Sequence, residues 1–499
     1  MFIWSDMCLA TEEIQRSIIN TVGIGRSGVM LPTVYDTAWL ARIPAKCNGT
    51  VPAFPKALKW VKQNQRPDGS WGGEIEYAHD RIISTLTAIL TLSKWQGERT
   101  TETIVRGLEY IWQRVGGLKN EYETIGFEVI APTLLEKCRA LGFNLPYSAF
   151  ERYKYMRKEK LAQVPPDVHY LKDTPLAFSL EFMGNGLNGQ ASKFPLEPNG
   201  SVAMSPSATA YLLTKDSGNV AARRYIDQMV QVYDDKAPHV FSFDIFETAW
   251  CLWNLYLGDP GIYQNDQVVR HIKDLEQALN HKRGAGFDSE YSVLDADETA
   301  VVFRVLRQAG LKSNLDYIRQ FEQDEHFVCY LTERNPSTSA NIHVLEALKG
   351  IDVIDKIKIV SWLRNEQRDG GYWMDKWHAS PYYATGHAVI ALLGTDNELA
   401  KSAVEWILDT QRFDGGWGHY GSSTAEETAY CLQALSIYGR DVEPIDQSVL
   451  ARGRKRLLEC MTEMPALWIG KCLYTPVKVV ESVIYSALKL TEFCDEASP

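Results

Sequence analysis

The sequence predicts an all-α protein built of many medium-length helices. Apolar residues recur at three- and four-residue spacing in segment after segment, as they do on one face of an α-helix. Strand-like alternation is scarce, and breaks rich in Gly, Pro and Asn separate the helical segments at short intervals. The clearest helical periodicity lies in residues 55–63, 82–95, 102–114, 300–309, 339–349, 388–393 and 426–437.

A turn-like motif repeats along the chain. Residues 65–71 (QRPDGSW) recur as 367–373 (QRDGGYW) and 411–417 (QRFDGGW), and residues 197–201 form a weaker copy. Each good copy carries the Asp-Gly of a tight turn. The motif could be an ordinary connector between two helices, or the turn that ties outer to inner helices in an α-α barrel. Three good copies favour the barrel.

Length and composition set further bounds. A chain of 499 residues is too long for one ordinary core, so we expect two domains. Apolar residues make up 45% and charged residues 23%, which is typical of a soluble globular protein. The net charge of -11 argues against a nucleic-acid binder, because no basic excess exists to neutralise phosphates.

The cysteines and the N-terminus bear on location. None of the nine cysteines forms a C-x-x-C pair, so neither zinc nor a disulfide framework is indicated. Residues 1–15 include acidic side chains and lack the pattern of a signal peptide. The most apolar helical stretch, residues 82–92, is too short to span a bilayer. We expect a cytoplasmic protein with reduced thiols and no transmembrane segment.

An acidic cluster precedes the helical run from Thr299 to Leu306. Asp295, Asp297 and Glu298 place three carboxylates within four residues. Such a cluster suits the protonation of an alkene, because neighbouring charges and a dry pocket raise the pKa of a carboxyl group. Asp297, the central residue, is the candidate proton donor. The cluster could instead be a solvated helix N-terminus or a divalent-metal loop.

Aromatic residues are abundant, with 14 Trp, 24 Tyr and 17 Phe. They could simply fill the core. They could also line a pocket in which negative ring faces stabilise carbocations.

At this point the chain resembles a known family, the class II terpene cyclases, and within it the class II diterpene cyclases. In its overall pattern of motifs, the chain is most similar to the short bacterial enzymes, such as halimadienyl and copalyl diphosphate synthases. The resemblance covers nearly the whole chain and rests on residues 35–39 (YDTAW), 65–71, 79–86 (HDRIISTL), 125–129 (IGFEV), 205–211 (SPSATAY), the acidic cluster, 303–306 (FRVL) and 375–377 (DKW).

The resemblance implies two α-α barrel domains in the βγ architecture of class II terpene cyclases. An inserted domain (γ) would run over residues 25–240. The other domain (β), with the acid motif, would comprise residues 1–24 and 241–499. The active cavity would lie between them.

The family's acid motif is Asp-x-Asp-Asp, which implies that Asp297 is the general acid and Asp295 its neighbour. Glu298 replaces the last Asp and adds a methylene group. Asn341 matches an amide that orients the acid's proton in plant relatives. A buried amide that satisfies backbone groups is the alternative.

A prenyl diphosphate substrate needs cationic partners. Lys376 in the DKW motif and Lys160 match diphosphate-binding lysines, although an isolated Lys is usually a solvated surface residue. Mg²⁺ bound with the diphosphate is the family expectation. Glu121 and Glu123 are candidate metal ligands, with a solvated loop as the alternative. Trp377, Tyr382 and Tyr383 are candidate cavity aromatics.

The terminal base is where the chain departs from its plant relatives, which hold a water molecule with a His-Asn pair. Phe178 stands at the His position and His239 at the Asn position. His239, a held water or a more distant base must then take the proton. Because Phe cannot accept a proton, the cation would live longer, and a rearranged halimadane or clerodane skeleton is expected more than plain copalyl diphosphate.

The leading hypothesis is a class II diterpene cyclase acting on geranylgeranyl diphosphate. The product should keep its diphosphate, because the only adjacent Asp pair, at 234–235, does not fit the D-D-x-x-D motif of ionising synthases. The alternatives are a drimenyl diphosphate synthase acting on farnesyl diphosphate, a hopene-type triterpene cyclase and a non-enzymatic α-barrel scaffold. A homodimer is possible.

Overall fold

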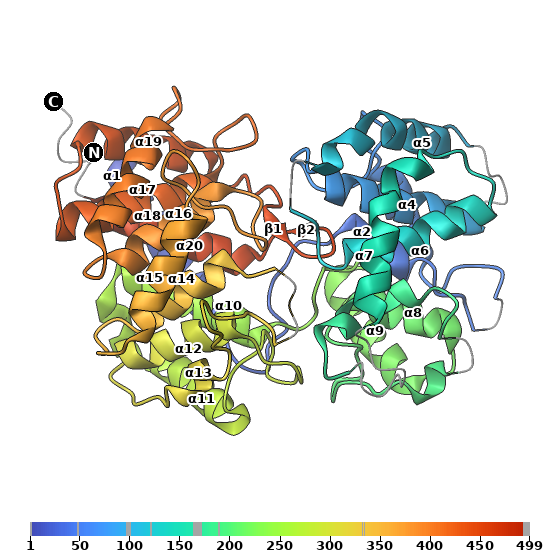
Figure 1. Ribbon diagram of the computed structural model, residues 1–499, viewed down its shortest axis with the longest axis horizontal. Coiled ribbons are helices and arrows are strands. Elements are labelled where there is room, and N and C mark those ends of the chain that lie inside the picture. Colours follow the sequence, from blue (N-terminus) through green and yellow to red (C-terminus); the bar gives the residue numbers. More distant parts are fainter. Residues whose placement is uncertain are drawn as a thin grey trace.

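A computed structural model describes residues 2–46, 49–95, 101–119, 122–162, 172–187, 190–331, 333 and 335–492, with the side chains of α1 described from residue 11 onward. Figure 1 shows two helical bodies side by side, joined near their middle. Helices make up nearly all of the regular structure, so the all-α prediction is confirmed.

The inserted body is a ring of buried elements with helices outside it. In the ring, α2 contacts α4, α4 contacts α6, and the 3₁₀ segment η4 links α6 to α8, which returns to α2. The ring elements are α2 (Val34–Leu40), α4 (Ala78–Trp95), α6 (Phe127–Ala140), η4 (Pro175–Met183) and α8 (Pro206–Lys215). The outer helices are α3 (Pro55–Gln63), α5 (Glu102–Arg114), α7 (Glu151–Ala162) and α9 (Val220–Tyr233), with short 3₁₀ turns η1 (Val115–Lys119), η2 (Tyr147–Phe150) and η5 (Ala191–Lys193).

The second body closes a ring of six inner helices, because each contacts the next and the last, α20, contacts the first, α10. They are α10 (Asp244–Gly258), α12 (Ala296–Gln308), α14 (Thr338–Ala347), α16 (Pro381–Leu392), α18 (Ala425–Asp441) and α20 (Val477–Leu490). Around them lie α1 (Phe2–Thr21), α11 (Asp266–Lys282), α13 (Asp316–Arg319), α15 (Asp355–Glu366), α17 (Asn397–Asp409) and α19 (Gln447–Cys460), with the turn η6 (Pro260–Gln264).

Burial explains why the inner and outer helices differ in their pattern of apolar residues. The first fifteen residues of α4 are all buried, so this helix has no solvent-facing polar side and its buried polar residues are interspersed with apolar ones. In the outer helix α3 only Ala57 and Val61 are buried, which gives a narrow apolar stripe. Two α-α barrels result, as the resemblance implied. The first helix, α1, packs on α20 of the second body. The predicted domain limits at 24/25 and 240/241 stay predictions.

The repeated turn ties three helices together. Trp71 Nε1 donates to Val61 O at the end of α3, and Trp71 N donates to Thr85 Oγ1 of the next inner helix. Gln65 Nε2 donates to Gly69 O in the turn and to Thr103 O at the start of the next outer helix. The copy at residues 411–417 repeats these contacts, with Trp417 Nε1 donating to Ile407 O and Gln411 Nε2 to Val449 O.

Glycine is required at one position of the turn. Gly69 has φ +90°, and a Cβ atom there would lie 2.6 Å from Arg106 O of the neighbouring helix. Gly415, at the same position in the third copy, has φ +88° and the same close approach to Arg452 O, at 2.7 Å.

A short hairpin joins the two bodies. It comprises β1 (Trp468–Ile469) and β2 (Leu473–Tyr474), and Figure 1 shows it reaching from the second body toward the first. Leu473 N donates to Asp80 Oδ1 in the first turn of α4, and Ile125 N donates to Gly470 O. The hairpin therefore carries side chains of the second body into the interface. No helix in the described ranges is long and apolar enough to cross a membrane.

Candidate active site

The acid cluster lies at the start of the inner helix α12. Asp295 is the N-cap residue, and its Oδ1 accepts a hydrogen bond of 2.8 Å from Glu298 N. Asp297 stands in the first turn and is 8% exposed. Because Asp295 caps the helix, the Asp297 carboxyl group is left to bind other partners.

Electrostatics favour retained protons in this cluster. Burial raises the pKa of Asp295 to about 7. Hydrogen bonds with Glu298 act to lower this pKa, and the charge of Asp297 acts to raise it. Burial also raises the pKa of Glu298 well above its ordinary range, and the charges of Asp295 and Asp297 raise it further. The three carboxyl groups therefore do not all ionise near neutral pH.

His343 of α14 is a partner of the acid that the sequence analysis missed. Its Nδ1 forms a short hydrogen bond with Asp297 Oδ1, and the ring is buried. His343 lies two residues beyond Asn341. A histidine in a helix that is buried on all sides would have been the signal, because a buried polar ring needs a partner.

Asn341 does not orient the acid in this structure. Its Oδ1 accepts from Phe327 N at 2.8 Å, and its Nδ2 donates to Phe327 O and Ser337 O at 2.9 Å. Both amide hydrogens are used by backbone carbonyls, so the alternative interpretation, a buried structural amide, describes it.

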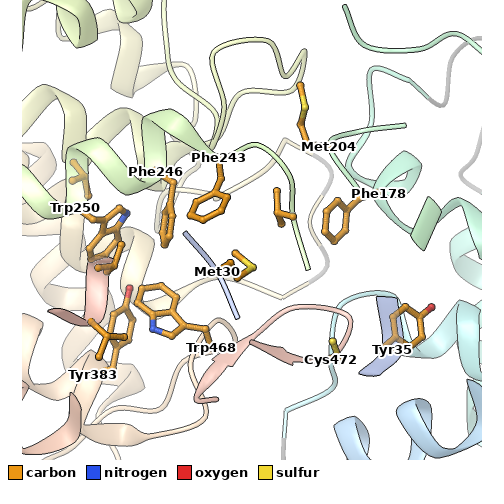
Figure 2. Close-up of a cluster of buried hydrophobic side chains, with 14 of the residues drawn as sticks. Met30, Tyr35, Phe178, Met204, Phe243, Phe246, Trp250, Tyr383, Trp468 and Cys472 are labelled. Atoms are coloured by element: carbon orange, nitrogen blue, oxygen red, sulfur yellow. The ribbon is translucent and has the colours of Figure 1, made fainter. Parts of the chain in front are cut away.

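Aromatic rings surround the acid and its histidine. Trp250 of α10 meets His343 edge-on at 4.7 Å between ring centroids. Tyr383 lies 5.1 Å from Trp468 of the hairpin, and Trp250 lies 5.8 Å from Trp468. Figure 2 shows Trp250, Tyr383 and Trp468 on one side of the interface and Phe178 and Tyr35 of the inserted body on the other. Tyr383 thus lies in an aromatic cluster beside the acid, and its role as a cavity residue stays a prediction.

The neighbouring predicted aromatics lie elsewhere. Tyr382 packs on Trp406 of the outer helix α17 at 4.9 Å, on the side away from the ring interior, and we withdraw it as a lining residue. Trp377 lies beside Tyr330 at 6.1 Å, and its carbonyl accepts from Ile469 N of the hairpin at 2.8 Å. Trp377 therefore supports the hairpin.

A second Asp–His pair lies on the inserted side of the interface. His239 Nδ1 lies 3.1 Å from Asp36 Oδ2, and His239 Nε2 accepts from Lys471 N at 3.2 Å. The neutral ring must therefore carry its proton on Nδ1 and donate it to Asp36. Both nitrogens are engaged, so His239 is not a free base. Gly470 makes this approach possible, since a Cβ there would lie 1.9 Å from His239 Nε2.

Lys471 holds this second pair in place. Its side chain is fully buried and forms an ion pair of 2.9 Å with Glu181. Its Nζ also donates to Phe178 O and to the hydroxyl groups of Ser205 and Ser207. The ammonium lies 4.5 Å from the centre of the Phe178 ring, so a fixed cation already occupies one face of that ring.

Asp36, His239 and Cys472 place their side-chain donors within 4.8 Å of one another. The arrangement does not suit a metal ion. The lone pair of His239 lies on Nε2, where it accepts the hydrogen bond from the Lys471 backbone N–H, and the Nδ1 that faces Asp36 carries a hydrogen. Lys471 adds a positive charge nearby. We therefore assign no metal here.

The predicted magnesium ligands are only partly described. Glu121 lies outside the described residues. Glu123 lies 4.0 Å from Arg152, and Glu128 of the same segment pairs with Lys160. These carboxylates already have cationic partners and do not form a ligand cluster in the part of the chain that the structure describes. Mg²⁺ stays a prediction.

Both predicted diphosphate lysines are paired with glutamates. Lys376 pairs with the buried Glu333 and donates to Asn335 O. Lys160, on α7, is half-exposed and pairs with the buried Glu128 at the start of α6. Their roles stay predictions, because an anion would have to compete with these carboxylates.

Sequence comparisons agree with the fold. The squalene-hopene cyclase C-terminal domain family matches residues 335–437, and the prenyltransferase alpha-alpha toroid domain family matches residues 50–124. A type B diterpene cyclase of Mycobacterium tuberculosis is 35% identical over 504 residues, covering 96% of this chain and 99% of that protein.

Plant and structural relatives extend the comparison. A bifunctional levopimaradiene synthase of Pinus taeda is 32% identical over 381 residues, covering 72% of this chain and 43% of that longer protein. The structure of ent-copalyl diphosphate synthase from Streptomyces platensis superposes with a TM-score of 0.77 at 27% identity, covering 98% of this chain and 100% of that one. With 35% identity along nearly all of both chains to a type B diterpene cyclase, the protein belongs to the class II diterpene cyclases.

Proposed function

We propose that the enzyme cyclises geranylgeranyl diphosphate by protonating its terminal alkene and that the product keeps the diphosphate. Asp297 donates the proton. The alkene's π electrons form the new C–H bond, Asp297 becomes a carboxylate, and the cation closes two rings before a proton leaves. The observation that carries this assignment is Asp297 itself, buried beside His343 and between two carboxyl groups of raised pKa.

The aromatic rings supply the remaining support for cation chemistry. Trp250, Tyr383 and Trp468 present π faces and edges to the region beside the acid. Rings stabilise a passing carbocation, and the two indole rings offer no free lone pair that would capture it. They also exclude water, which would otherwise end the reaction early.

The diphosphate would lie at the Lys376 end of the interface. Tyr122 of the inserted body lies close enough to Arg368 and Asp375 of the second body for both to influence its pKa. The segment after Glu121 therefore faces the loop that carries Lys376. Lys376 is the proposed diphosphate ligand, with Lys160 and Mg²⁺ as further members of this end of the site.

A rearranged skeleton of halimadane or clerodane type follows from the missing early base. Phe178 cannot accept a proton, and both nitrogens of His239 are engaged by Asp36 and Lys471. The bicyclic cation then has time for hydride or methyl shifts before it loses a proton. The fixed Lys471 ammonium also disfavours positive charge near Phe178 and would hold the cation toward Trp250.

The test is incubation of the purified enzyme with geranylgeranyl or farnesyl diphosphate, followed by phosphatase treatment and mass analysis. We expect a bicyclic C20 alcohol that is released only after phosphatase treatment. A C15 product from farnesyl diphosphate alone would support the drimenyl alternative. Hydrocarbon released without phosphatase, or no product from either substrate, would overturn the proposal.

A further inference from the structure

A second histidine stands behind the acid's partner. His343 Nε2 lies 3.0 Å from His387 Nδ1, so Asp297, His343 and His387 form one hydrogen-bonded chain. The three residues come from α12, α14 and α16, which are consecutive helices of the inner ring. Their side chains meet because neighbouring inner helices face the same interior.

His387 sits in a pocket of rings. Trp253 lies edge-on at 5.0 Å, Tyr383 at 4.6 Å and Tyr430 at 5.1 Å between centroids. Its Nε2 is buried and has no hydrogen-bond partner within the described ranges. Burial first, and then the nearby His343 and His378, lower the pKa of His387 well below its ordinary value. A charged His387 is therefore disfavoured.

A neutral His387 with its proton on Nε2 offers a lone pair on Nδ1, directed at His343 Nε2. His343 must then donate its Nε2–H to His387. If His343 is neutral, its Nδ1 carries no proton and takes the acid's hydrogen bond, which leaves no free acid proton. If His343 is an imidazolium, it donates to both neighbours, and the Asp297 proton stays on Oδ2, free to reach the alkene.

We propose that His387 is a positioning residue for this chemistry: by accepting the Nε2–H of His343, it keeps His343 in the doubly protonated form that directs the Asp297 proton toward the substrate. The proposal deepens the proposed function and rests on Asp297 being the acid. His387 itself touches no reacting atom, and after the proton leaves Asp297 the imidazolium faces the new carboxylate.

Among the residues that the structure describes, few titratable groups face His387. His343 approaches from α14, with Asp297 behind it, and α10 contributes the uncharged rings of Trp250 and Trp253. The remaining titratable neighbours are Tyr383 on its own helix, Tyr430 on α18, His378 before α16, and Glu426, which binds Tyr430 and His378. A change in the pH dependence of a His387 variant could therefore also come from His378 or Glu426, and a control must separate these contributions.

Two nearly isosteric variants separate hydrogen bonding from packing. His387→Asn keeps an oxygen acceptor near the position of Nδ1, whereas His387→Leu has the same shape without one. We expect His387→Leu to lower kcat by about ten- to a hundredfold, the worth of a hydrogen bond to a charged group, with KM unchanged. The alkaline limb of its pH profile should move to lower pH, because His343 loses its proton more easily. His387→Asn should retain most of kcat and the original limb.

Equal losses in both variants with an unmoved alkaline limb, or a fully active His387→Leu, would overturn the proposal. His378→Gln serves as the control, since it alters the neighbouring titratable group and should leave the alkaline limb of the pH profile in place. A limb that moves in this control would assign the effect to His378 and also overturn the proposal.

A measurement without substrate keeps the proposal separate from the proposed function. ¹⁵N-histidine NMR of the wild-type enzyme, assigned with His387→Asn, should show His343 protonated on both nitrogens and His387 without a proton on Nδ1. A proton on His387 Nδ1 would make it a donor and overturn the proposal, whatever the substrate. If the protonation states are as expected and neither prenyl diphosphate is turned over, the failure belongs to the proposed function.

Discussion

The two sides of the interface each hold a buried Asp–His pair, and the pairs differ in what surrounds them. Asp297–His343 lies beside two more carboxyl groups and neutral aromatic rings. Asp36–His239 lies beside the Lys471 ammonium and accepts a further hydrogen bond of 2.8 Å from Thr33. The same two residue types therefore lie beside carboxyl groups of raised pKa in one place and beside a fixed positive charge in the other.

The pKa directions express this difference. Burial raises the pKa of Asp295 to about 7 and raises that of Glu298. Burial also acts to raise the pKa of Asp36, but the hydrogen bond and charge of His239 and the charge of Lys471 outweigh it and lower the value. The neighbouring groups, and not burial itself, decide whether the pKa of a buried carboxyl group is raised or lowered.

Exchanging each aspartate for asparagine should break the two pairs in different ways. Asp297→Asn should abolish turnover, with a loss of at least about a thousandfold, because an amide has no acidic proton for carbon. Its melting temperature should stay near that of the wild type. Asp36→Asn should reverse the pattern, keeping measurable turnover in the folded fraction and losing stability. Product assays and thermal melts on both variants test this. Wild-type yield from Asp297→Asn would remove it from the mechanism.

Lys471 should matter more for stability than for the rate of turnover. Lys471→Met keeps the length of the side chain but leaves Glu181 without its cation in the interior. Removing one member of a buried pair costs about 3–5 kcal/mol of folding free energy. Urea unfolding should therefore show a clear loss, and the double variant Lys471→Met with Glu181→Gln should recover part of it. A single variant as stable as the wild type would contradict this role.

The acid cluster and the second pair should change the folding stability in opposite directions as the pH rises. The folded-state pKa of Asp295 lies above its unfolded value, so the enzyme loses stability as pH rises through about 7. Asp36 has a lowered pKa, so its contribution is present at neutral pH and is lost in acid. Asp295→Asn keeps the helix cap and should lower kcat about ten- to a hundredfold, while stability at pH 8–9 rises by about 1–3 kcal/mol. Equal alkaline sensitivity in the variant would contradict the assignment.

Lys376 tests the substrate end of the acid-bearing side. Lys376→Ala should raise KM about ten- to a hundredfold, because a charge-assisted contact to the diphosphate is lost, and should change kcat little. Glu333→Gln is the matched variant, since it frees Lys376 from its carboxylate partner and should lower KM. An unchanged KM in Lys376→Ala would remove this residue from the binding site.

The smallest expected effect concerns which product forms. Phe178→His places an imidazole beside His239, and we expect it to accept a proton early. The mixture should shift toward the unrearranged olefin or a hydroxylated product, with total turnover within about tenfold of the wild type. Gas chromatography of the dephosphorylated products measures this shift. An unchanged mixture would mean that residue 178 does not face the cation.

The helical pattern predicted the fold well. The segment 55–63 coincides with α3 and 102–114 with α5, because amphipathic outer helices have a clear apolar stripe. The segment 388–393 captured only the end of α16, which begins at Pro381, because an inner helix buried on all sides shows little periodicity. The repeated turns were recognisable from sequence because their Asp-Gly and Trp are local features.

The site was harder to predict, because its key contacts join residues far apart in the chain. Asp297 was recognisable from its acidic neighbours. His343, 46 residues away, and Lys471, 290 residues beyond Glu181, have no local signal. The sequence left two interpretations of Asn341 open, because it lies only two residues before His343 on the same helix, and sequence alone does not tell which side chain binds backbone and which binds the acid.

The origin of the transferred proton tests the central claim most directly. Wild-type enzyme equilibrated in D₂O should give a dephosphorylated product that carries one deuterium, because Asp297 exchanges with solvent and delivers that hydrogen to carbon. Later hydride or methyl shifts are intramolecular and add none. Asp297→Asn should give no labelled product, while folded Asp36→Asn should give the singly labelled one. A wild-type product without deuterium, or labelled product from Asp297→Asn, would contradict the account.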